Sequence, residues 1–152
     1  MHTAENFAGE DKAMQSIGFI GLGNVGGKLA GSLLRNQCQL MVRDLDRTVA
    51  QPFIDAGASW ADSPKIMAEQ CDMVITCLPS PAASAAVMED DDGILAGLSD
   101  GKIWAEMSTT DGAEVTRLGA LAKERGADPV DCPVSGGCHR AATGNIAIFA
   151  GC

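Results

Sequence analysis

Residues 17–26 read IGFIGLGNVG, an apolar run that leads directly into three glycines with the spacing G-x-G-x-x-G. The apolar residues at 17–20 predict a short strand. Apolar side chains then recur at helical spacing over 25–34, which predicts a helix. This stretch therefore predicts a strand, a glycine turn and a helix in direct succession.

The glycine turn has the features that a dinucleotide pyrophosphate requires: a sharp bend, a backbone free of side chains, and the amide-rich end of a helix. Asp44 lies 18 residues after Gly26 at the end of the next predicted strand, where a carboxylate can accept bonds from both ribose hydroxyls. A plain structural turn is the alternative, since a glycine-rich turn can simply join a strand to a helix. The predicted cofactor-binding residues here are Gly21, Leu22, Gly23, Asn24, Val25, Gly26 and Asp44.

The choice of cofactor depends on the end of that second strand. A carboxylate there repels the 2′-phosphate of NADP, so Asp44 favours NAD. Arg43 and Arg47 keep NADP possible because either could reach a 2′-phosphate, although an arginine beside aspartates is also typical of a surface ion pair.

Beyond the first unit, short apolar runs alternate with helical segments along the whole chain. Such alternation predicts parallel βαβ units, hence an α/β fold with a doubly wound, mostly parallel, Rossmann-like sheet in a single domain at 15–152. Residues 1–14 show no period and are interpreted as a flexible leader. We predict strands at 40–42, 73–77, 102–107, 128–131 and 145–150, and helices at 48–56 (capped by Thr48), 64–70 (capped by Ser63), 82–88 and 111–125.

The composition excludes several classes of partner. The 152 residues carry 11 basic and 20 acidic side chains, a net charge of -9 that repels nucleic acid and anionic lipid. No run approaches 18 apolar residues, so a membrane span is not expected, and the first fifteen residues contain no secretory h-region.

The six cysteines show no C-x-x-C spacing. They are interpreted as buried, reduced thiols, which predicts a cytoplasmic protein. No cluster with the spacing of a metal site is present, so no metal is expected.

Four motifs in the same order resemble the β-hydroxyacid dehydrogenases, the family of 3-hydroxyisobutyrate dehydrogenase and tartronate semialdehyde reductase. They are residues 17–26, Cys77-Leu78-Pro79, Ser108-Thr109-Thr110 and the segment DCPVSGG at 131–137. The resemblance covers residues 15–151, and the last motif is the most diagnostic.

The resemblance implies roles for three motifs. Leu78 and Pro79 would line the nicotinamide side of the cofactor cleft, and Thr109 would contact the cofactor near the nicotinamide ribose. The segment Ser135-Gly136-Gly137 would hold the substrate carboxylate, because glycines expose main-chain amides and a serine adds a donor. A plain turn at 135–137, and a helix-capping role for 108–110, are the alternatives.

This chain also departs from the family pattern. Glu106 stands where aspartate is usual, and the resemblance implies a catalytic lysine on a helix after the dinucleotide-binding domain, followed by an all-helical domain, neither of which we expect in this chain. The catalytic group is therefore unknown. His139 is expected to point to solvent, and the other departures are Ala83, Gly112 and Ala150-Gly151-Cys152, while Lys28, Lys65, Lys102 and Lys123 are expected to be exposed charges.

The resemblance implies an oxidoreductase that transfers hydride between NAD (or NADP) and a small β-hydroxy acid or semialdehyde. Its partner would be that small molecule, with a homo-oligomer possible. The alternative is a stand-alone dinucleotide-binding or sensing module without turnover.

Overall fold

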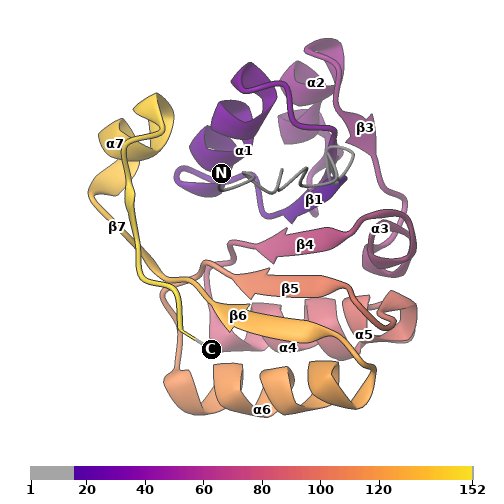
Figure 1. The fold of residues 1–152 in the computed structure, drawn as a ribbon. Helices are drawn as coiled ribbons and strands as arrows, with labels where there is room; N and C mark the ends of the chain where they lie inside the picture. Colours follow the sequence, from indigo (N-terminus) through magenta and orange to yellow (C-terminus); the bar gives the residue numbers. More distant parts are fainter. Residues whose placement is uncertain (1–15, 152) are drawn as a thin grey trace, which may run out of the picture.

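The computed structural model describes residues 16–151 and contains a six-stranded, entirely parallel sheet (Figure 1). The strand order is β3-β2-β1-β4-β5-β6, so the chain winds outward from β1 in one direction and then from β4 in the other. The predicted doubly wound α/β fold is confirmed. The strands are β1 (Ile17–Ile20), β2 (Leu40–Arg43), β3 (Ser59–Trp60), β4 (Met73–Thr76), β5 (Ile103–Glu106) and β6 (Asp128–Asp131).

Helices cover both faces of the sheet, because successive strand residues point to opposite faces. Phe19 belongs to the core under α1 and α2, whereas its neighbour Ile20 belongs to the core under α3 to α6, and Trp104 and Ala105 of β5 divide in the same way. The strands therefore read as continuous apolar runs. The helices are α1 (Gly26–Arg35), α2 (Arg47–Asp55), α3 (Pro64–Gln70), α4 (Pro81–Glu89), α5 (Ile94–Gly97) and α6 (Gly112–Glu124).

The winding direction reverses between β1 and β4. Ile20 at the end of β1 pairs with Arg43 of β2 on one side and with Thr76 of β4 on the other. The loops that follow these three strands consequently diverge at one edge of the sheet. Such a switch point is where open α/β sheets bind ligands.

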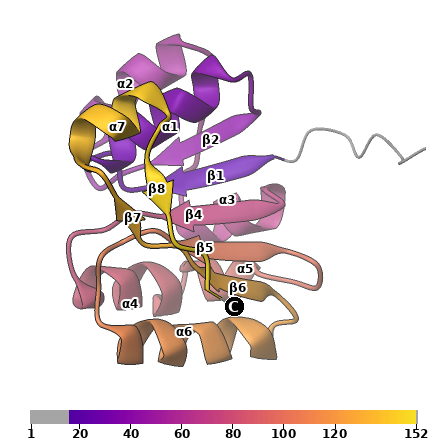
Figure 2. The same cartoon turned by 60° about the vertical axis from the view of Figure 1, so that its left-hand side comes forward.

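The last part of the chain leaves the main sheet (Figure 2). After β6, the chain forms β7 (Val134–Ser135), α7 (Gly137–Thr143) and β8 (Ala147–Ile148), with β7 and β8 paired as a separate antiparallel ribbon. Helix α7 packs against α1, far from β6 in the strand order. We call residues 132–150 the strap.

The strand predicted at 145–150 was therefore wrong in extent and in pairing. Only Ala147–Ile148 is extended, and it pairs with β7 rather than with the sheet. The chain returns to the sheet edge at Gly151, which exchanges two backbone hydrogen bonds with Asp131 at 2.8 and 3.1 Å. An apolar run alone does not reveal which partner a strand will find.

The predicted Thr48 cap and the alternative capping role of residues 108–110 were also wrong. Asp46, not Thr48, caps α2: its carboxylate accepts from the Thr48 backbone N–H and from the Thr48 hydroxyl, which lowers the pKa of Asp46. Asp111, not the segment 108–110, caps α6 by accepting from Ala113 N. Aspartate caps both helices because its short carboxylate reaches the free N–H groups of the first helical turn. The Ser63 cap of α3 is confirmed.

Lys102 is not the exposed charge that the sequence suggested. Its ammonium donates to three carbonyl oxygens, those of Ala68, Glu69 and Cys71, at 2.6 to 2.8 Å. These carbonyls lie at the end of α3, where a helix offers unpaired acceptors and a negative dipole end. Lys28 and Lys123 are exposed and Lys65 is partly exposed.

Some sequence predictions fall partly or wholly outside the described part of the chain. The leader expected at 1–14 lies outside it, as does Cys152. Within residues 16–151, no helix is long and apolar enough to cross a membrane. In the same range, no group of three or more histidine, cysteine or acidic side chains could hold a metal ion.

Candidate functional site

A cleft of about 840 Å³ opens at the switch point, along the carboxyl ends of the strands. It brings together residues that are more than 100 positions apart in the chain, from the glycine turn to the strap. Leu22 is the exception among the predicted site residues, because its side chain is buried in the core. The predicted residues that line the cleft are Gly21, Gly23, Asn24, Val25, Gly26, Asp44, Leu78, Pro79, Thr109, Ser135, Gly136 and Gly137.

The three motif glycines of the turn meet different surroundings. Gly21 has a φ of +99°, and a Cβ there would lie 2.1 Å from the carbonyl oxygen of Cys77. A Cβ on Gly26 would lie 1.9 Å from the carbonyl oxygen of Gly21, whereas a Cβ on Gly23 would meet nothing within 4 Å. Packing thus requires Gly21 and Gly26, and Gly23 faces open space in the cleft.

The turn also presents unpaired donors. Among the described residues, the N–H groups of Gly23, Asn24 and Val25 have no hydrogen-bond partner, and all three residues line the cleft immediately before α1. Free N–H groups at the positive end of a helix favour an anion. This geometry fits the pyrophosphate of a dinucleotide.

Asp44 is held in place by the turn that it faces. Its Oδ2 accepts from Leu22 N at 2.8 Å and its Oδ1 accepts from Asp46 N at 3.0 Å. The carboxylate therefore ties the glycine turn to the end of β2 and still lines the cleft. Each oxygen keeps a further lone pair for an outside donor.

The two neighbouring arginines form no surface ion pair, so that alternative was wrong for both within residues 16–151. Their guanidinium carbons lie 5.6 Å (Arg43) and 5.1 Å (Arg47) from the centre of the Trp60 ring, a cation–π geometry. Arg43 also donates to the carbonyl oxygens of Ala61 and Asp62 at 2.8 and 2.7 Å. The indole ring of Trp60 in β3 thus makes cation–π contacts with both Arg43 and Arg47.

The opposite wall consists of the loops after β4 and β5. Leu78 N donates to the Ser108 hydroxyl at 2.7 Å, which joins the two loops. Cys77 also lines this wall, and burial, with a smaller contribution from Glu106, raises the pKa of its thiol to about 11. The thiol is therefore protonated near neutral pH and is a poor nucleophile.

The strap contributes further lining residues to the cleft. Gly136 has a φ of +126°, a conformation that favours glycine, and it precedes the first turn of α7. Ser135 is exposed and lines the cleft beside Val134. His139 is exposed and does not line the cleft, as expected.

Sequence reasoning missed several lining residues. Leu45 is fully exposed and lines the cleft. It directly follows Asp44, so the prediction of Asp44 as a cofactor-binding residue could have pointed to Leu45 as well. Ile146 reaches the cleft only because the strap folds back, for which no local pattern exists. Ala86 and Val87 of α4 and Pro64 of α3 also line the cleft and were not predicted.

Comparisons with known proteins agree with this geometry. The family model described as the NAD binding domain of 6-phosphogluconate dehydrogenase matches residues 16–152. The NAD-dependent L-serine dehydrogenase of Pseudomonas aeruginosa is 37% identical over 138 residues, which are 91% of this chain and 46% of that protein. The mitochondrial 3-hydroxyisobutyrate dehydrogenase of Rattus norvegicus is 36% identical over 135 residues, which are 89% of this chain and 40% of that protein.

The fold is also similar to that of a solved structure, Psf3 in complex with NADP+ and 2-OPP. The TM-score is 0.84 at 31% identity, over 88% of this chain and 48% of that one. The chain thus spans less than half of the length of each of these proteins. It belongs to the family of the NAD binding domain of 6-phosphogluconate dehydrogenase, and it is an NAD(P)-binding domain of the kind found in 3-hydroxyisobutyrate dehydrogenases.

Proposed function

We propose that this chain binds NAD as the dinucleotide-binding part of an oxidoreductase acting on a small β-hydroxy acid or its semialdehyde. One observation carries the proposal: a single cleft is lined both by the free main-chain donors of residues 23–25 and by the segment Ser135-Gly136-Gly137. The cofactor pyrophosphate and a substrate carboxylate are both anions, and each would have its own set of donors.

Each part of the cleft would have a separate task. The N–H groups of 23–25 bind the pyrophosphate, and Asp44 accepts from the ribose hydroxyls. Leu78, Pro79 and Thr109 contact the nicotinamide half, whose C4 carries the hydride when the cofactor is bound. The hydroxyl of Ser135 donates to the substrate carboxylate.

The residues around Asp44 support NAD over NADP. The Asp44 carboxylate at the end of β2 would repel a 2′-phosphate bound there, and Arg43 and Arg47 both lie over the ring of Trp60. The relative from Pseudomonas aeruginosa is described as NAD-dependent, whereas Psf3 is in complex with NADP+. The family thus accommodates either cofactor, and the local charge supports NAD for this chain.

No residue of the cleft is assigned as the proton donor or acceptor for the reacting oxygen. No lysine or histidine among residues 16–151 lines the cleft. General acid–base catalysis contributes about 10²–10⁴-fold to such reactions. We therefore expect residues 1–152 by themselves to bind cofactor with little turnover. The alternative function, a dinucleotide-binding or sensing module in the cytoplasm, predicts the same result.

A fluorescence titration with NADH tests cofactor binding. Gly23→Val adds a side chain to the cleft lining at the glycine turn and should abolish binding, while thermal stability stays close to that of the native chain because a Cβ at position 23 meets nothing within 4 Å. Gly112→Val is the matched control, since Gly112 also meets nothing within 4 Å but lies outside the cleft. Retained NADH binding by Gly23→Val would overturn the proposed site.

The same titration with NADPH tests cofactor choice. Asp44→Asn keeps an acceptor for one backbone N–H and removes the charge, so the ratio of NADH affinity to NADPH affinity should fall. A ratio equal to that of the native chain would contradict the role of Asp44 in excluding the 2′-phosphate.

A further inference from the structure

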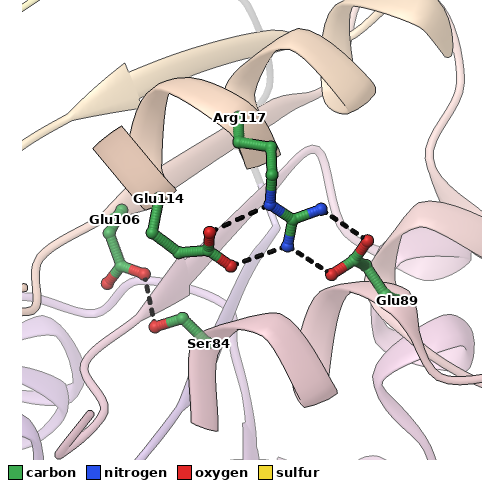
Figure 3. A network of polar contacts seen from close by, with 5 residues as sticks. All are labelled: Ser84, Glu89, Glu106, Glu114 and Arg117. Atoms are coloured by element: carbon green, nitrogen blue, oxygen red, sulfur yellow. Dashed lines mark hydrogen bonds and ion pairs between the residues drawn. The ribbon is translucent and has the colours of Figure 1, made fainter. Parts of the chain in front are cut away.

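Behind the nicotinamide-side wall lies a carboxyl group that no function described above uses. Glu106 ends β5 and is completely buried. Its Oε2 accepts from the Ser84 hydroxyl at 2.9 Å, and its Oε1 accepts from Ser108 N at 2.8 Å (Figure 3 shows the contact with Ser84). A buried carboxyl group is costly unless its oxygens are paired, and both oxygens are paired here.

These contacts continue to the surface of the cleft. Ser108, whose backbone Glu106 holds, accepts with its hydroxyl from Leu78 N. Ser84 belongs to α4, the helix that contributes Ala83, Ala86 and Val87 to the cleft. Glu106 thus connects the loop after β5 and α4 directly, and it connects the loop after β4 through Ser108.

An apolar residue of similar size would fill the space behind the wall at a lower desolvation cost, but it could not accept from two donors on different segments. The carboxyl group of Glu106 is therefore suited to orienting the segments that carry Ser84 and Ser108. Glutamate also extends one methylene further than aspartate from the end of β5, toward the hydroxyl on α4.

We propose that Glu106 is a positioning residue that sets the nicotinamide-side wall, acting through Ser84, Ser108 and Leu78 on a cofactor that it does not touch. Glu106 itself does not line the cleft. The inference rests on the proposed function, since it assigns the nicotinamide half of the cofactor to this wall.

A second connection to α4, from Arg117 of α6, provides a control. Arg117 of α6 donates to Glu89 of α4 and to Glu114, with N–O distances of 2.6 Å, on the outer side of the helices (Figure 3). These side chains are partly exposed, and none of them lines the cleft. Arg117→Met therefore loosens α4 from outside without disturbing the contacts of Glu106.

The experiment compares two ligands, NADH and ADP-ribose, which lacks the nicotinamide. In Glu106→Gln, one carboxyl oxygen becomes an amide NH2, which can pair with the Ser84 hydroxyl only if that hydroxyl turns to accept, so NADH affinity should fall roughly three- to tenfold, as expected for a change worth about one hydrogen bond. ADP-ribose affinity should stay within about twofold, since the proposed function assigns its contacts to the glycine turn and Asp44 rather than to this wall. Ser84→Ala should shift NADH binding in the same direction, and Arg117→Met should change neither affinity.

Hydrogen exchange supplies the structural readout. Glu106→Gln should speed exchange of the Leu78 and Ser108 amides, and Arg117→Met should leave both unchanged. Ser84→Ala keeps the test decisive if Glu106→Gln does not fold.

Three results would overturn the proposal. They are equal weakening of NADH and ADP-ribose in Glu106→Gln, unchanged NADH affinity in both variants, and equal affinities of the two ligands for the native chain. Failure of the proposed function is distinguishable, because the native chain would then bind neither ligand.

Discussion

The glycine turn and the strap both offer main-chain groups to the same cleft, but they are held in different ways. The turn lies inside the sheet edge, where Gly26 and Gly21 are in direct backbone contact and Asp44 holds Leu22 N. The strap lies outside the sheet, as a two-stranded ribbon and a seven-residue helix. Packing in the turn admits no added atom, whereas the strap is held by hydrogen bonds at its base and by the packing of α7, with the buried Ala141, against α1.

The connections of the strap can be named individually. Its base is closed by the paired Asp131 and Gly151 and by Phe149 N, which donates to the carbonyl oxygen of Pro133 at 3.1 Å. Its far end rests on α1 through the contact of the Arg35 guanidinium with the carbonyl oxygen of Ala142. The comparison implies that the cofactor end should tolerate change poorly and that the strap should respond locally.

The largest effect is expected for Gly26→Ala. Its methyl would lie 1.9 Å from a backbone oxygen that cannot move without opening the turn. We expect a loss of about 3 kcal/mol or more in the free energy of unfolding, measured in urea, together with loss of NADH binding. Gly31→Ala in the same helix is the control, because its nearest neighbour is the flexible end of Arg35 at 3.4 Å. A stable, NADH-binding Gly26→Ala would remove the distinction between the two regions.

A smaller and local effect is expected for Gly136→Ala. The positive φ makes a Cβ unfavourable, and that Cβ would lie 2.8 Å from Cδ of Arg140. We expect a cost of about 1–3 kcal/mol confined to the strap. Proteolysis and hydrogen exchange should increase at 132–150 while NADH binding persists. If NADH affinity fell as far as in Gly26→Ala, the strap and the turn would be one cooperative unit.

The thiols of Cys71 and Cys77 make the stability of the chain depend on pH. Burial raises the pKa of Cys71 and of Cys77 from 9.0 to about 11. Both thiols stay protonated in the folded chain between pH 9 and 11 but ionise in the unfolded chain, so the stability that they contribute should be fully present below pH 9 and should be lost as the pH rises through 11.

Mass-resolved alkylation with iodoacetamide at pH 8 checks the same burial residue by residue. Cys138 of the strap and Cys77 are both half-buried, but the raised pKa of Cys77 disfavours its thiolate, so Cys138 should react before Cys77 and before the buried Cys71. Faster alkylation of Cys77 would show that the wall beside the glycine turn opens readily. Denaturation of the Cys71→Ala and Cys77→Ala variants at pH 8 and pH 10 assigns the stability change to each thiol.

The smallest effect is expected for Arg35→Met, which removes one exposed hydrogen bond between α1 and the strap. We expect less than about 1 kcal/mol of global destabilisation. Hydrogen exchange should rise in α7 and remain unchanged in α1. Unchanged exchange in α7 would show that the buried Ala141, rather than Arg35, holds the helix.

The helices and strands next to strong local signals were predictable. Ser63 before Pro64 marked the start of α3, and the glycine spacing marked the turn before α1. The errors fell where two residues competed for one role, as at Thr48 and Asp46, or where a side chain found distant partners, as at Lys102. Sequence spacing does not distinguish such competitors, since the outcome depends on reach in three dimensions.

The sequence by itself determined the alternation of strands and helices, the glycine turn and the position of Asp44, because these depend on neighbours within a few residues. Only the tertiary structure decided that the strap crosses from the edge of the sheet to α1 and that Glu106 pairs with Ser84. Both depend on contacts between residues more than 20 positions apart, and such contacts exist only once the sheet has brought its loops to one edge.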